Sequence, residues 1–361
     1  MILQFGAGNF LRAFVDLFVS ETGFDEIVVV QSTGNERAAA LNRAGGKYQV
    51  AIQGFAGGRV IDETQEVTSI KEALHAGTQW DRVLEIARAP ELRWIVSNTT
   101  EAGFALDAGD AANTGVPRSF PAKLLSVLLA RHDAGLPGSV ILPCELIERN
   151  AERLRDLVLE QAARWQVSPE AIAWLRESCH WMNNLVDRIV PGPPKSHPLL
   201  GKDPILLSAE PFAFWAIETV GAFEFRHPAV VTAPDITSYY LRKVRILNGL
   251  HSALVCHALP MGIETVREAV EHPEVGPWME DLLFNEIVPV LEGRVEDPAN
   301  FARTTLERFR NPFLEHKLSA IALNHAEKVK VRLRPTCEEY RVKFDREPRL
   351  LAGLTENNQP T

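Results

Sequence analysis

The chain opens with MILQFGAGNF, residues 1–10, in which a short apolar segment leads directly into a turn that carries two glycines. Ile2–Phe5 is typical of a buried β-strand, and helical periodicity follows over Phe10–Ser20. Leu11 stands where the full dinucleotide fingerprint has a third glycine, and a lone G-x-G is common. Its place after the first strand of a βαβ pattern nevertheless favours a turn that holds a pyrophosphate at a helix N-terminus. The residues of this predicted cofactor turn are Gly6, Ala7, Gly8, Asn9 and Phe10.

Strand-like and helix-like segments alternate through the first half of the chain, which predicts a Rossmann-like, doubly wound α/β domain with a mainly parallel sheet. The predicted strands are Ile2–Phe5, Glu26–Gln31, Leu92–Ser97 and Ser139–Pro143, with a hairpin over Tyr48–Phe55 and Arg59–Val67. The predicted helices are Phe10–Ser20, Trp80–Ala89, Ala122–Ala130 and Glu148–Trp165.

After Asp235 only helical patterns remain, over Ser238–His257, Val275–Leu291, Ala299–Phe309 and Phe313–Val329. We therefore expect a dinucleotide-binding domain over residues 1–230 and an all-helical substrate and catalytic domain over residues 231–361. The polar segment Thr355–Thr361 is expected to be disordered.

Composition narrows the class of protein. The 361 residues are 46% hydrophobic and 24% charged, as in an ordinary folded protein, and no apolar run approaches a membrane span. We expect no signal peptide, because no basic region leads into an apolar block at the start. The net charge of −9, without long basic runs, argues against nucleic acid or an anionic membrane as partner. A small anionic substrate stays possible, since it needs only one or two local cations.

The four cysteines are scattered and form no C-x-x-C pair. This pattern predicts neither disulfides nor a metal site, and it favours the reducing cytoplasm as the compartment. The sequence gives no indication of the oligomeric state.

Ser97, Asn98 and Thr99 directly follow the predicted strand Leu92–Ser97. Ligands of parallel sheets bind beyond the carboxyl ends of the strands, so these side chains are placed to contact a ribose or a nicotinamide. A hydrogen-bonded turn that caps the next element is an equal alternative.

The end of the second predicted strand bears on the choice of cofactor. Gln31 stands where NAD-binding domains often carry an acidic residue for the ribose hydroxyls, and Glu36 and Arg37 follow soon after. Glu36 could still reach a ribose, whereas Arg37 could meet a 2′-phosphate. These residues therefore leave the choice between NAD and NADP open.

The segment KVRILNGLH, residues 243–251, places Lys243, Asn248 and His251 in an otherwise apolar helical run. With Asp235 or Thr237 capping the helix, the positive end of its dipole and desolvation disfavour an ammonium at Lys243, as a general base requires. In α-helical geometry His251 lies about 80° around the axis from Lys243. Asn248 shares a face with His251, and a neutral amide there would stabilise a developing alkoxide. The alternative is an amphipathic helix with a few polar residues by chance.

Further polar side chains lie outside this helix. Asn183 could hydrogen-bond a substrate hydroxyl, while the neighbouring Asp187 and Arg188 are better suited to structural hydrogen bonds. In the segment RFRNPFLEHKLSAIALN and just beyond it, the candidate substrate contacts are Arg308, Asn311, His316 and Lys328. Solvated-face or domain-packing roles are equally open for each of these four.

These segments together resemble the polyol-specific long-chain dehydrogenase/reductase family, also called the mannitol dehydrogenase family. The family pattern K-x4-N-x2-H is met by Lys243, Asn248 and His251, V-D-R by Val186–Arg188, and G-x-G-x-F-x-R by residues 6–12. Longer matching stretches run in the family's order: QFGAGNFLRAFVD, VSNTTEAG, PCELIERN, LVDRIVPG, VRILNGLHSALV and NPFLEHKLSAIALN.

The resemblance is strongest to the branch of this family that acts on D-tagaturonate and D-altronate. It implies an NAD-linked, metal-independent oxidoreductase of hexuronate breakdown that interconverts a keto sugar acid and its hydroxy acid. It further implies Lys243 as the general acid/base, with Asn183, Asn248 and His251 around the reacting oxygen. The implied fold is a Rossmann-like domain followed by a helical domain.

Two alternatives stay open beside this function. Within the same chemistry, the protein is a mannitol or other polyol 2-dehydrogenase, or a fructuronate reductase; a cation positioned for the substrate carboxylate would separate acid from polyol. In a different class, it is a catalytically impaired dinucleotide-binding protein. The chain is shorter than the family pattern after Lys328, which favours the impaired protein, whereas the retained Lys243, Asn248 and His251 speak against it.

Overall fold

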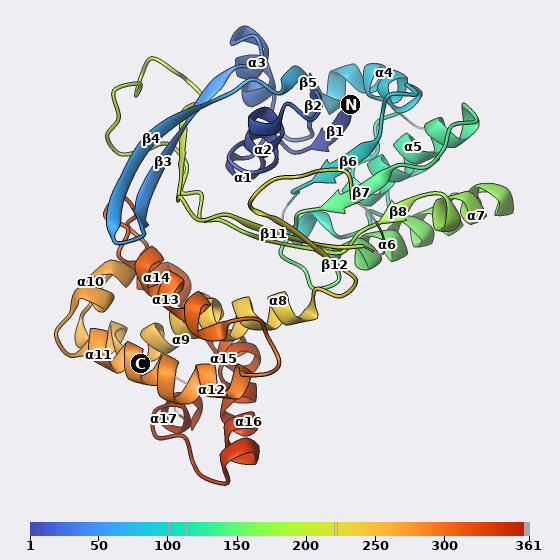
Figure 1. Cartoon of the computed structure of the whole chain (residues 1–361). Helices are drawn as coiled ribbons and strands as arrows, with labels where there is room; N and C mark the ends of the chain where they lie inside the picture. The colour runs from blue at the N-terminus through green and yellow to red at the C-terminus, as the bar shows by residue number, and fades with distance from the viewer. Residues whose placement is uncertain (100, 113–114, 220, 222, 357–361) are drawn as a thin grey trace. The chain divides into compact units, whose positions relative to one another are not determined.

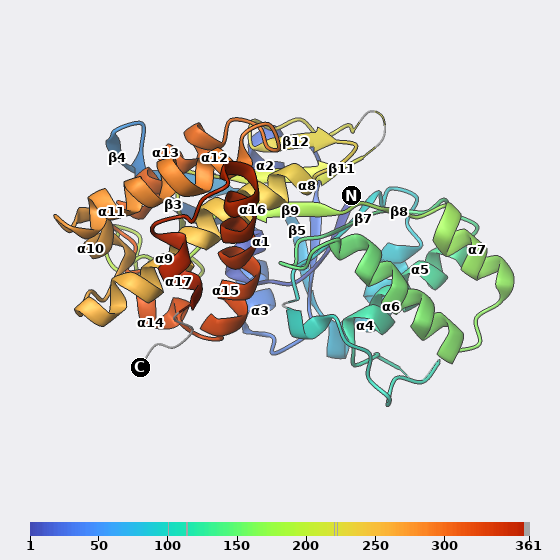
Figure 2. The same ribbon diagram turned by 90° about the horizontal axis from the view of Figure 1, so that it is seen from below.

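The structure, a computed structural model, describes residues 1–99, 101–112, 115–219, 221 and 223–356 (Figures 1 and 2). It divides into two compact units. The first comprises Met1–Ala51, Thr64–Ala209 and Ala213–Ile236, and the second comprises Ile52–Glu63, Glu210–Phe212 and Thr237–Thr361. The predicted division after residue 230 lies near Ile236, where the chain last passes from the first unit to the second. The hairpin tip Ile52–Glu63 and the segment Glu210–Phe212 also belong to the second unit, although they precede this division.

The first unit is built on a six-stranded sheet in the order β5-β2-β1-β6-β7-β8. The bounds of its strands, in chain order, are Ile2–Phe5 (β1), Ile27–Gln31 (β2), Ile70–His75 (β5), Trp94–Ser97 (β6), Val140–Pro143 (β7) and His180–Trp181 (β8). All the neighbouring strands pair in parallel, so the predicted parallel sheet is confirmed. The chain builds outward from β1 on one side and then returns to β6 on the other. The topological switch point, where open α/β sheets bind ligands, therefore lies between β1 and β6.

The strands of this sheet are apolar on both faces because helices cover them. Every residue of β1, β2 and β6 is buried. The helices α4, α5, α6 and α7 pack against one another beside the sheet (Figures 1 and 2). The bounds of the helices in this unit are Asn9–Arg12 (α1), Val15–Thr22 (α2), Glu36–Arg43 (α3), Ala76–Ala87 (α4), Phe120–Asp133 (α5), Asn150–Arg164 (α6) and Pro169–Glu177 (α7). The short 3₁₀ turn η1 spans Glu101–Gly103.

The helix predicted over Phe10–Ser20 is two helices. Phe14, with φ −131° and ψ −89°, lies between α1 and α2 and departs from helical geometry. The break lets its ring pack on Phe10, 4.8 Å between centroids, and on Phe18 at 4.6 Å. A periodic apolar pattern does not reveal such a kink, because the same residues are buried on both sides of it.

Two smaller sheets complete the strands. One has the order β12-β11-β9, with Val230–Ala233 (β12) parallel and Asn184–Asp187 (β9) antiparallel to Phe214–Glu218 (β11). The other has the order β10-β3-β4, in which Tyr48–Ala56 (β3) and Arg59–Val67 (β4) form the predicted hairpin beside Leu207–Ala209 (β10).

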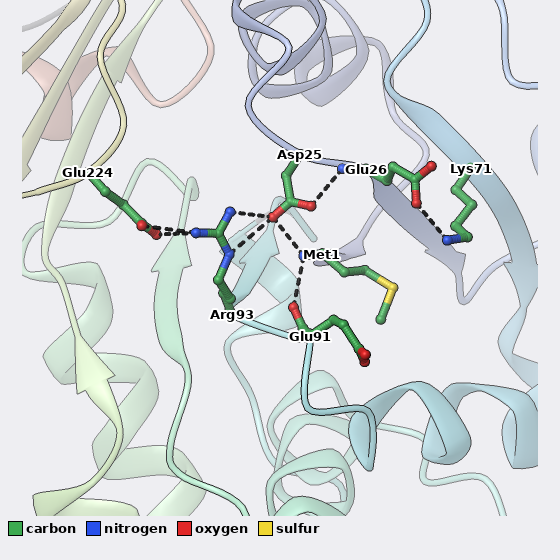
Figure 3. Close-up of polar contacts among 7 residues, drawn as sticks. All are labelled: Met1, Asp25, Glu26, Lys71, Glu91, Arg93 and Glu224. Carbon is green, nitrogen blue, oxygen red and sulfur yellow. Dashed lines mark hydrogen bonds and ion pairs between the residues drawn. The ribbon is translucent and has the colours of Figure 1, made fainter.

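Ion pairs tie together the amino-terminal edge of the large sheet (Figure 3). The amine of Met1 lies 2.6 Å from Asp25 Oδ2 and 2.8 Å from the Glu91 carbonyl. The guanidinium of Arg93 reaches the same Asp25 oxygen at 2.6 Å and both oxygens of Glu224 at 2.9 Å. This edge thus carries structural pairs, whereas Gly6, Gly8 and Ser97–Thr99 of the predicted cofactor site lie at the opposite, carboxyl edge of the sheet.

The second unit is helical around an apolar core to which nearly all of its helices contribute. Its central helix is Gly249–His257 (α9), which contacts α10, α14, α15 and α17. The other elements are Thr237–Arg242 (α8), Lys243–Asn248 (η2), Leu259–Met261 (η3), Val266–Glu271 (α10), Val275–Asp281 (α11), Leu282–Ile287 (η4), Val288–Leu291 (α12), Pro298–Phe309 (α13), Leu318–Ile321 (α14), His325–Arg332 (α15), Arg334–Phe344 (α16) and Leu351–Glu356 (α17).

Four predictions for this unit need correction. The helices expected over Ser238–His257 and Val275–Leu291 each contain a π-helical segment, η2 and η4. The helix expected over Phe313–Val329 is two helices: α14 ends at Ile321, and Asn324, with a φ of +56°, is the N-cap of α15. Thr355 is ordered within α17, with its hydroxyl 3.1 Å from the Leu351 carbonyl, and residues 357–361 lie outside the described part. No helix among the described residues is long and apolar enough to cross a membrane.

Candidate active site

The glycine turn lies at the switch point of the large sheet. Gly6 has a φ of +127°, and a Cβ built there would lie 3.1 Å from the carbonyl oxygen of Asn98, so the turn presses against the end of β6. A Cβ on Gly8 would meet nothing within 4 Å, which leaves open space beside that backbone. Ala7 is buried, and the turn can therefore offer a ligand only its backbone at that position. A half-buried glycine backbone next to open space fits a pyrophosphate.

Arg12 holds the first residue of α1 in place. Its guanidinium is 4% exposed and donates from Nη2 to Asn9 Oδ1 at 2.7 Å and from Nη1 to the Ile205 carbonyl at 2.6 Å. The hydroxyl of Tyr48 lies 2.8 Å from the Arg12 carbonyl and 3.0 Å from Asp16 Oδ2. A buried polar network thus stands behind the predicted cofactor turn.

Ser97, Asn98 and Thr99 are held by the segment that follows β7. Ser97 Oγ donates to Glu145 Oε2 at 3.0 Å, and the backbone N–H and hydroxyl of Thr99 bond to Glu145 Oε1 at 2.8 and 3.1 Å. Asn98 Nδ2 donates to the Cys144 carbonyl at 2.6 Å. Burial raises the pKa of Glu145, while these hydrogen bonds lower it. These residues are therefore held by Cys144 and by Glu145, a glutamate that the sequence did not single out.

The end of β2 lies at the same edge, because β2 pairs in parallel with β1. Gln31 is used locally: Nε2 donates to the Thr33 carbonyl at 2.8 Å, and Oε1 accepts from Ala38 N at 2.8 Å. Glu36 and Arg37 are both exposed in the first turn of α3. The structure thus leaves the choice between a ribose hydroxyl and a 2′-phosphate at this edge open.

Asn183 has a structural environment. Its Oδ1 accepts from the backbone N–H groups of Ala151 and Glu152, both at 3.2 Å, at the start of α6. Its Nδ2 donates to Glu152 Oε1 at 3.3 Å and to Glu218 Oε1 at 3.1 Å. An amide has two hydrogens and two acceptor positions, so a substrate would have to displace one of these bonds.

The π-helical segment η2 changes the expected geometry of the K-x4-N pattern. In an α-helix, residues five apart are about 140° apart around the axis. A π-helix bonds residue i to residue i+5, so this spacing places Lys243 and Asn248 one above the other, one turn apart. Both are half-buried, whereas the four residues between them are buried. The segment therefore presents a lysine and an amide together at one surface, which α-helical geometry would not do.

His251, in the following helix, is a buried and neutral imidazole. Its ring stacks on Phe309 at 4.5 Å between centroids and meets His316 edge-on at 4.8 Å. Burial holds the pKa of His251 well below its usual range, and the charges of His316, Arg308, Arg332 and Lys328 lower it further. Nε2 is buried without a hydrogen-bond partner among the described residues. Such an atom calls for a partner, which a bound hydroxyl or oxyanion would supply.

Arg308 and Asn311, predicted as substrate contacts, are packing residues in this structure. Arg308 is 3% exposed and forms a two-pronged ion pair with Glu210, Nε to Oε2 at 2.9 Å and Nη2 to Oε1 at 2.7 Å. Its guanidinium also covers the ring of Phe212. Asn311 is buried and donates to the Gln53 carbonyl at 3.1 Å, which fixes the hairpin tip within the second unit. Both side chains thus make structural contacts, and the contact of either residue with substrate stays a prediction.

His316 and Lys328 stay candidates. His316 is half-buried beside His251, and burial lowers its pKa. Lys328 is half-buried and donates to the Ile321 carbonyl at 2.8 Å, a neutral acceptor that leaves its charge uncompensated. Among the described residues, no group of three or more His, Cys, Asp or Glu side chains is arranged to hold a metal ion.

An α/β unit with a glycine turn at its switch point and a helical unit with a paired lysine and amide define a dehydrogenase of the long-chain type. Profiles described as "Mannitol dehydrogenase Rossmann domain" and "Mannitol dehydrogenase C-terminal domain" match residues 1–228 and 235–354. The chain belongs to the mannitol dehydrogenase family.

Relatives support this family, and two solved structures have a similar fold. An altronate oxidoreductase of Bacillus subtilis is 39% identical over 362 residues, 94% of this chain and 75% of the relative. One from Klebsiella pneumoniae is 38% identical over 356 residues, 92% of this chain and 74% of the relative. A substrate-free D-sorbitol dehydrogenase superposes with a TM-score of 0.82 at 23% identity, covering 96% of this chain and 77% of that one. The mannitol 2-dehydrogenase of Pseudomonas fluorescens, in complex with NAD and D-mannitol, gives 0.77 at 22% identity, with 98% and 77% covered.

Proposed function

We propose that the protein is an NAD-dependent oxidoreductase that interconverts D-altronate and D-tagaturonate in the cytoplasm. The observation that carries the substrate is the similarity, over more than nine-tenths of the chain, to relatives named altronate oxidoreductase. The four cysteines are free thiols, as expected in a reducing compartment.

The glycine turn supports a dinucleotide. The open space beside Gly8 leaves room for phosphate oxygens, and Ser97–Thr99 stand next to it at the carboxyl end of β6. When bound, the nicotinamide supplies the acceptor or donor of hydride. Ala7 and Gly8 would contact the pyrophosphate through their backbone. Glu36, the first acidic residue after β2, would contact the ribose hydroxyls.

Lys243 is the proposed general acid/base. In the oxidation of altronate its neutral amine takes the proton of the hydroxyl whose carbon loses hydride, and in the reduction of tagaturonate its ammonium returns that proton. Asn248, one π-turn away, would donate an amide hydrogen to the same oxygen and stabilise its alkoxide character. The neutral ring of His251 would serve as a second hydrogen-bonding group, since its Nε2 lacks a partner among the described residues.

A spectrophotometric test follows NADH absorbance with altronate, tagaturonate, fructuronate, fructose and mannitol as substrates. We expect altronate oxidation and tagaturonate reduction to have the highest kcat/KM, and a higher kcat/KM with mannitol or fructuronate would overturn the choice of substrate. Lys243→Ala should keep NADH binding and lose at least 100-fold in kcat, a typical contribution of general acid/base catalysis. Lys330→Ala is the matched control, because Lys330 is exposed and pairs with Glu327 at 2.6 Å. Wild-type protein that binds NADH but turns over none of these substrates would favour the impaired dinucleotide-binding protein.

A further inference from the structure

α15 carries a pair of cations that no carboxylate neutralises. Lys328 and Arg332 are four residues apart, so they share a face of the helix. Neither forms an ion pair with an acidic side chain in the part of the chain that the structure describes. Their pKa values are lowered, first by burial, and for Lys328 also by the charge of Arg332. Like charges at this spacing destabilise a helix, so the pair needs a reason to be there.

Arg332 joins this helix to the segment that carries the proposed acid/base. Its Nη1 lies 3.5 Å from the carbonyl oxygen of Asn248 and 3.3 Å from Ser252 Oγ. α15 packs along both α9 and η2 within the second unit (Figures 1 and 2). The guanidinium is half-buried and uses one nitrogen for these contacts, which leaves its other N–H groups for a ligand.

The unpaired atom of His251 lies in the same neighbourhood. Its ring is only 7% exposed, and Nε2 has no partner among the described residues. Ser252, which contacts Arg332, directly follows His251 in α9. Two uncompensated cations and one buried, unpaired hydrogen-bonding atom beside a proposed reacting centre are the complement of a small anion that also carries hydroxyl groups.

We propose that Arg332, with Lys328 beside it, binds the carboxylate of the substrate and thereby selects sugar acids over uncharged polyols. This inference rests on the proposed function. Arg308, the other cation considered for this task, is already paired with Glu210, so Arg332 and Lys328 are the better candidates. The chain has a net charge of −9, which on the whole repels an anionic substrate. Binding such a substrate therefore requires a local cluster of cations such as Lys328 and Arg332.

The experiment compares Arg332→Gln, Arg332→Lys and wild type with altronate and with D-altritol, which has the same carbon chain but no carboxylate. Altritol is measured as a substrate or, where turnover is absent, as a competitive inhibitor. Loss of a charged hydrogen bond corresponds to about 10- to 100-fold. We expect Arg332→Gln to raise KM for altronate by this factor with kcat within about threefold, to leave altritol affinity unchanged, and to be partly rescued by Arg332→Lys. Lys330→Gln, on the same helix, is the charge-matched control.

The outcomes separate this inference from the function on which it depends. Wild type that fails to oxidise altronate overturns the proposed function. If wild type is active but Arg332→Gln loses affinity for altronate and altritol equally, carboxylate recognition is overturned. The same holds if the variant loses kcat and thermal stability together. Arg332 is then a structural link between α15 and α9. Unchanged NADH affinity in the variant shows that the cofactor unit is intact.

Discussion

Asp16 should make the stability of the protein depend on pH. This carboxyl lies in α2, directly behind the cofactor turn, and is completely buried. One oxygen accepts from the Tyr48 hydroxyl at 3.0 Å, and the other, Oδ1, has no partner among the described residues. Burial raises the pKa of Asp16 from 3.8 to about 7, against the opposing effect of its hydrogen bonds and of Arg12. The unpaired oxygen is the natural position for the proton.

The direction and size of this pH dependence follow from the linkage between proton binding and folding. The folded protein holds this proton up to a pH of about 7, whereas the unfolded chain releases it near 3.8. The stabilisation relative to the ionised form is therefore complete below that lower value and is lost as the pH rises through about 7. A shift of roughly 3 units corresponds to about 4 kcal/mol at most. Asp16→Asn keeps the shape and stays neutral, so it removes this dependence.

The assay compares thermal unfolding of wild type and Asp16→Asn at pH 5 and pH 8. At pH 5 the variant should be equal to wild type or less stable, because it replaces a neutral carboxyl and disturbs the contact with Tyr48. At pH 8 it should gain stability relative to wild type by several degrees in Tm. Asp110→Asn is a useful contrast. Burial raises the pKa of Asp110, but hydrogen bonds from Ser119 and Arg118 outweigh it, so the pKa is lowered. The loss of stability in Asp110→Asn should therefore be greatest at high pH. A difference between Asp16→Asn and wild type that is the same at both pH values would refute the reasoning.

Two other predictions concern the cofactor turn and the core of the second unit. Gly6→Ala should weaken NADH binding and lower Tm, because a side chain at φ +127° costs about 1–3 kcal/mol and would crowd the Asn98 carbonyl. Gly8→Ala should leave Tm unchanged but weaken NADH binding, and fluorescence titration with NADH distinguishes the two; an Ala at either position that binds NADH normally contradicts the proposed turn. Glu210→Gln should destabilise the protein by about 3–5 kcal/mol in thermal unfolding, because it leaves Arg308 buried without its counter-charge. The double variant Glu210→Leu with Arg308→Met should recover most of that loss, and equal losses in single and double variants would rule out the ion pair as the cause.

The sequence was sufficient to predict the central strands of the large sheet, because these strands are apolar on both faces. β1, β2, β6 and β7 were all predicted from such segments. β5 was missed because Lys71 and Glu72 interrupt its apolar pattern, and Lys71 pairs with Glu26 at the surface. β8 has two residues, too few for any periodicity to be visible.

The sequence could suggest a candidate site only where its residues are close together in the chain. The glycine turn and the Lys243 segment each lie within ten residues of chain and carry a recognisable spacing. Glu145, 48 residues from Ser97, and Arg332, 84 residues from Asn248, act through contacts that only the folded chain brings together. For the same reason the sequence did not reveal that Arg308 pairs with Glu210, which lies 98 residues away. A charged residue in an apolar helix signals a role, but its partner decides whether that role is packing or binding.

The π-helical segment is the feature that makes the lysine and the amide a pair, and the rest of the second unit holds it in place. A π turn is rarely stable by itself, because it interrupts the α-helical hydrogen bonds on either side. Here the four intervening residues are buried, and Arg245 among them donates to Thr336 Oγ1 at 2.8 Å and to Glu339 at 3.2 Å. Reverting to an α-helix would turn Asn248 by roughly 140° from Lys243 and would disturb these contacts. The chemistry proposed for residues 243–251 therefore depends on packing against α16, which no reading of that segment alone could have shown.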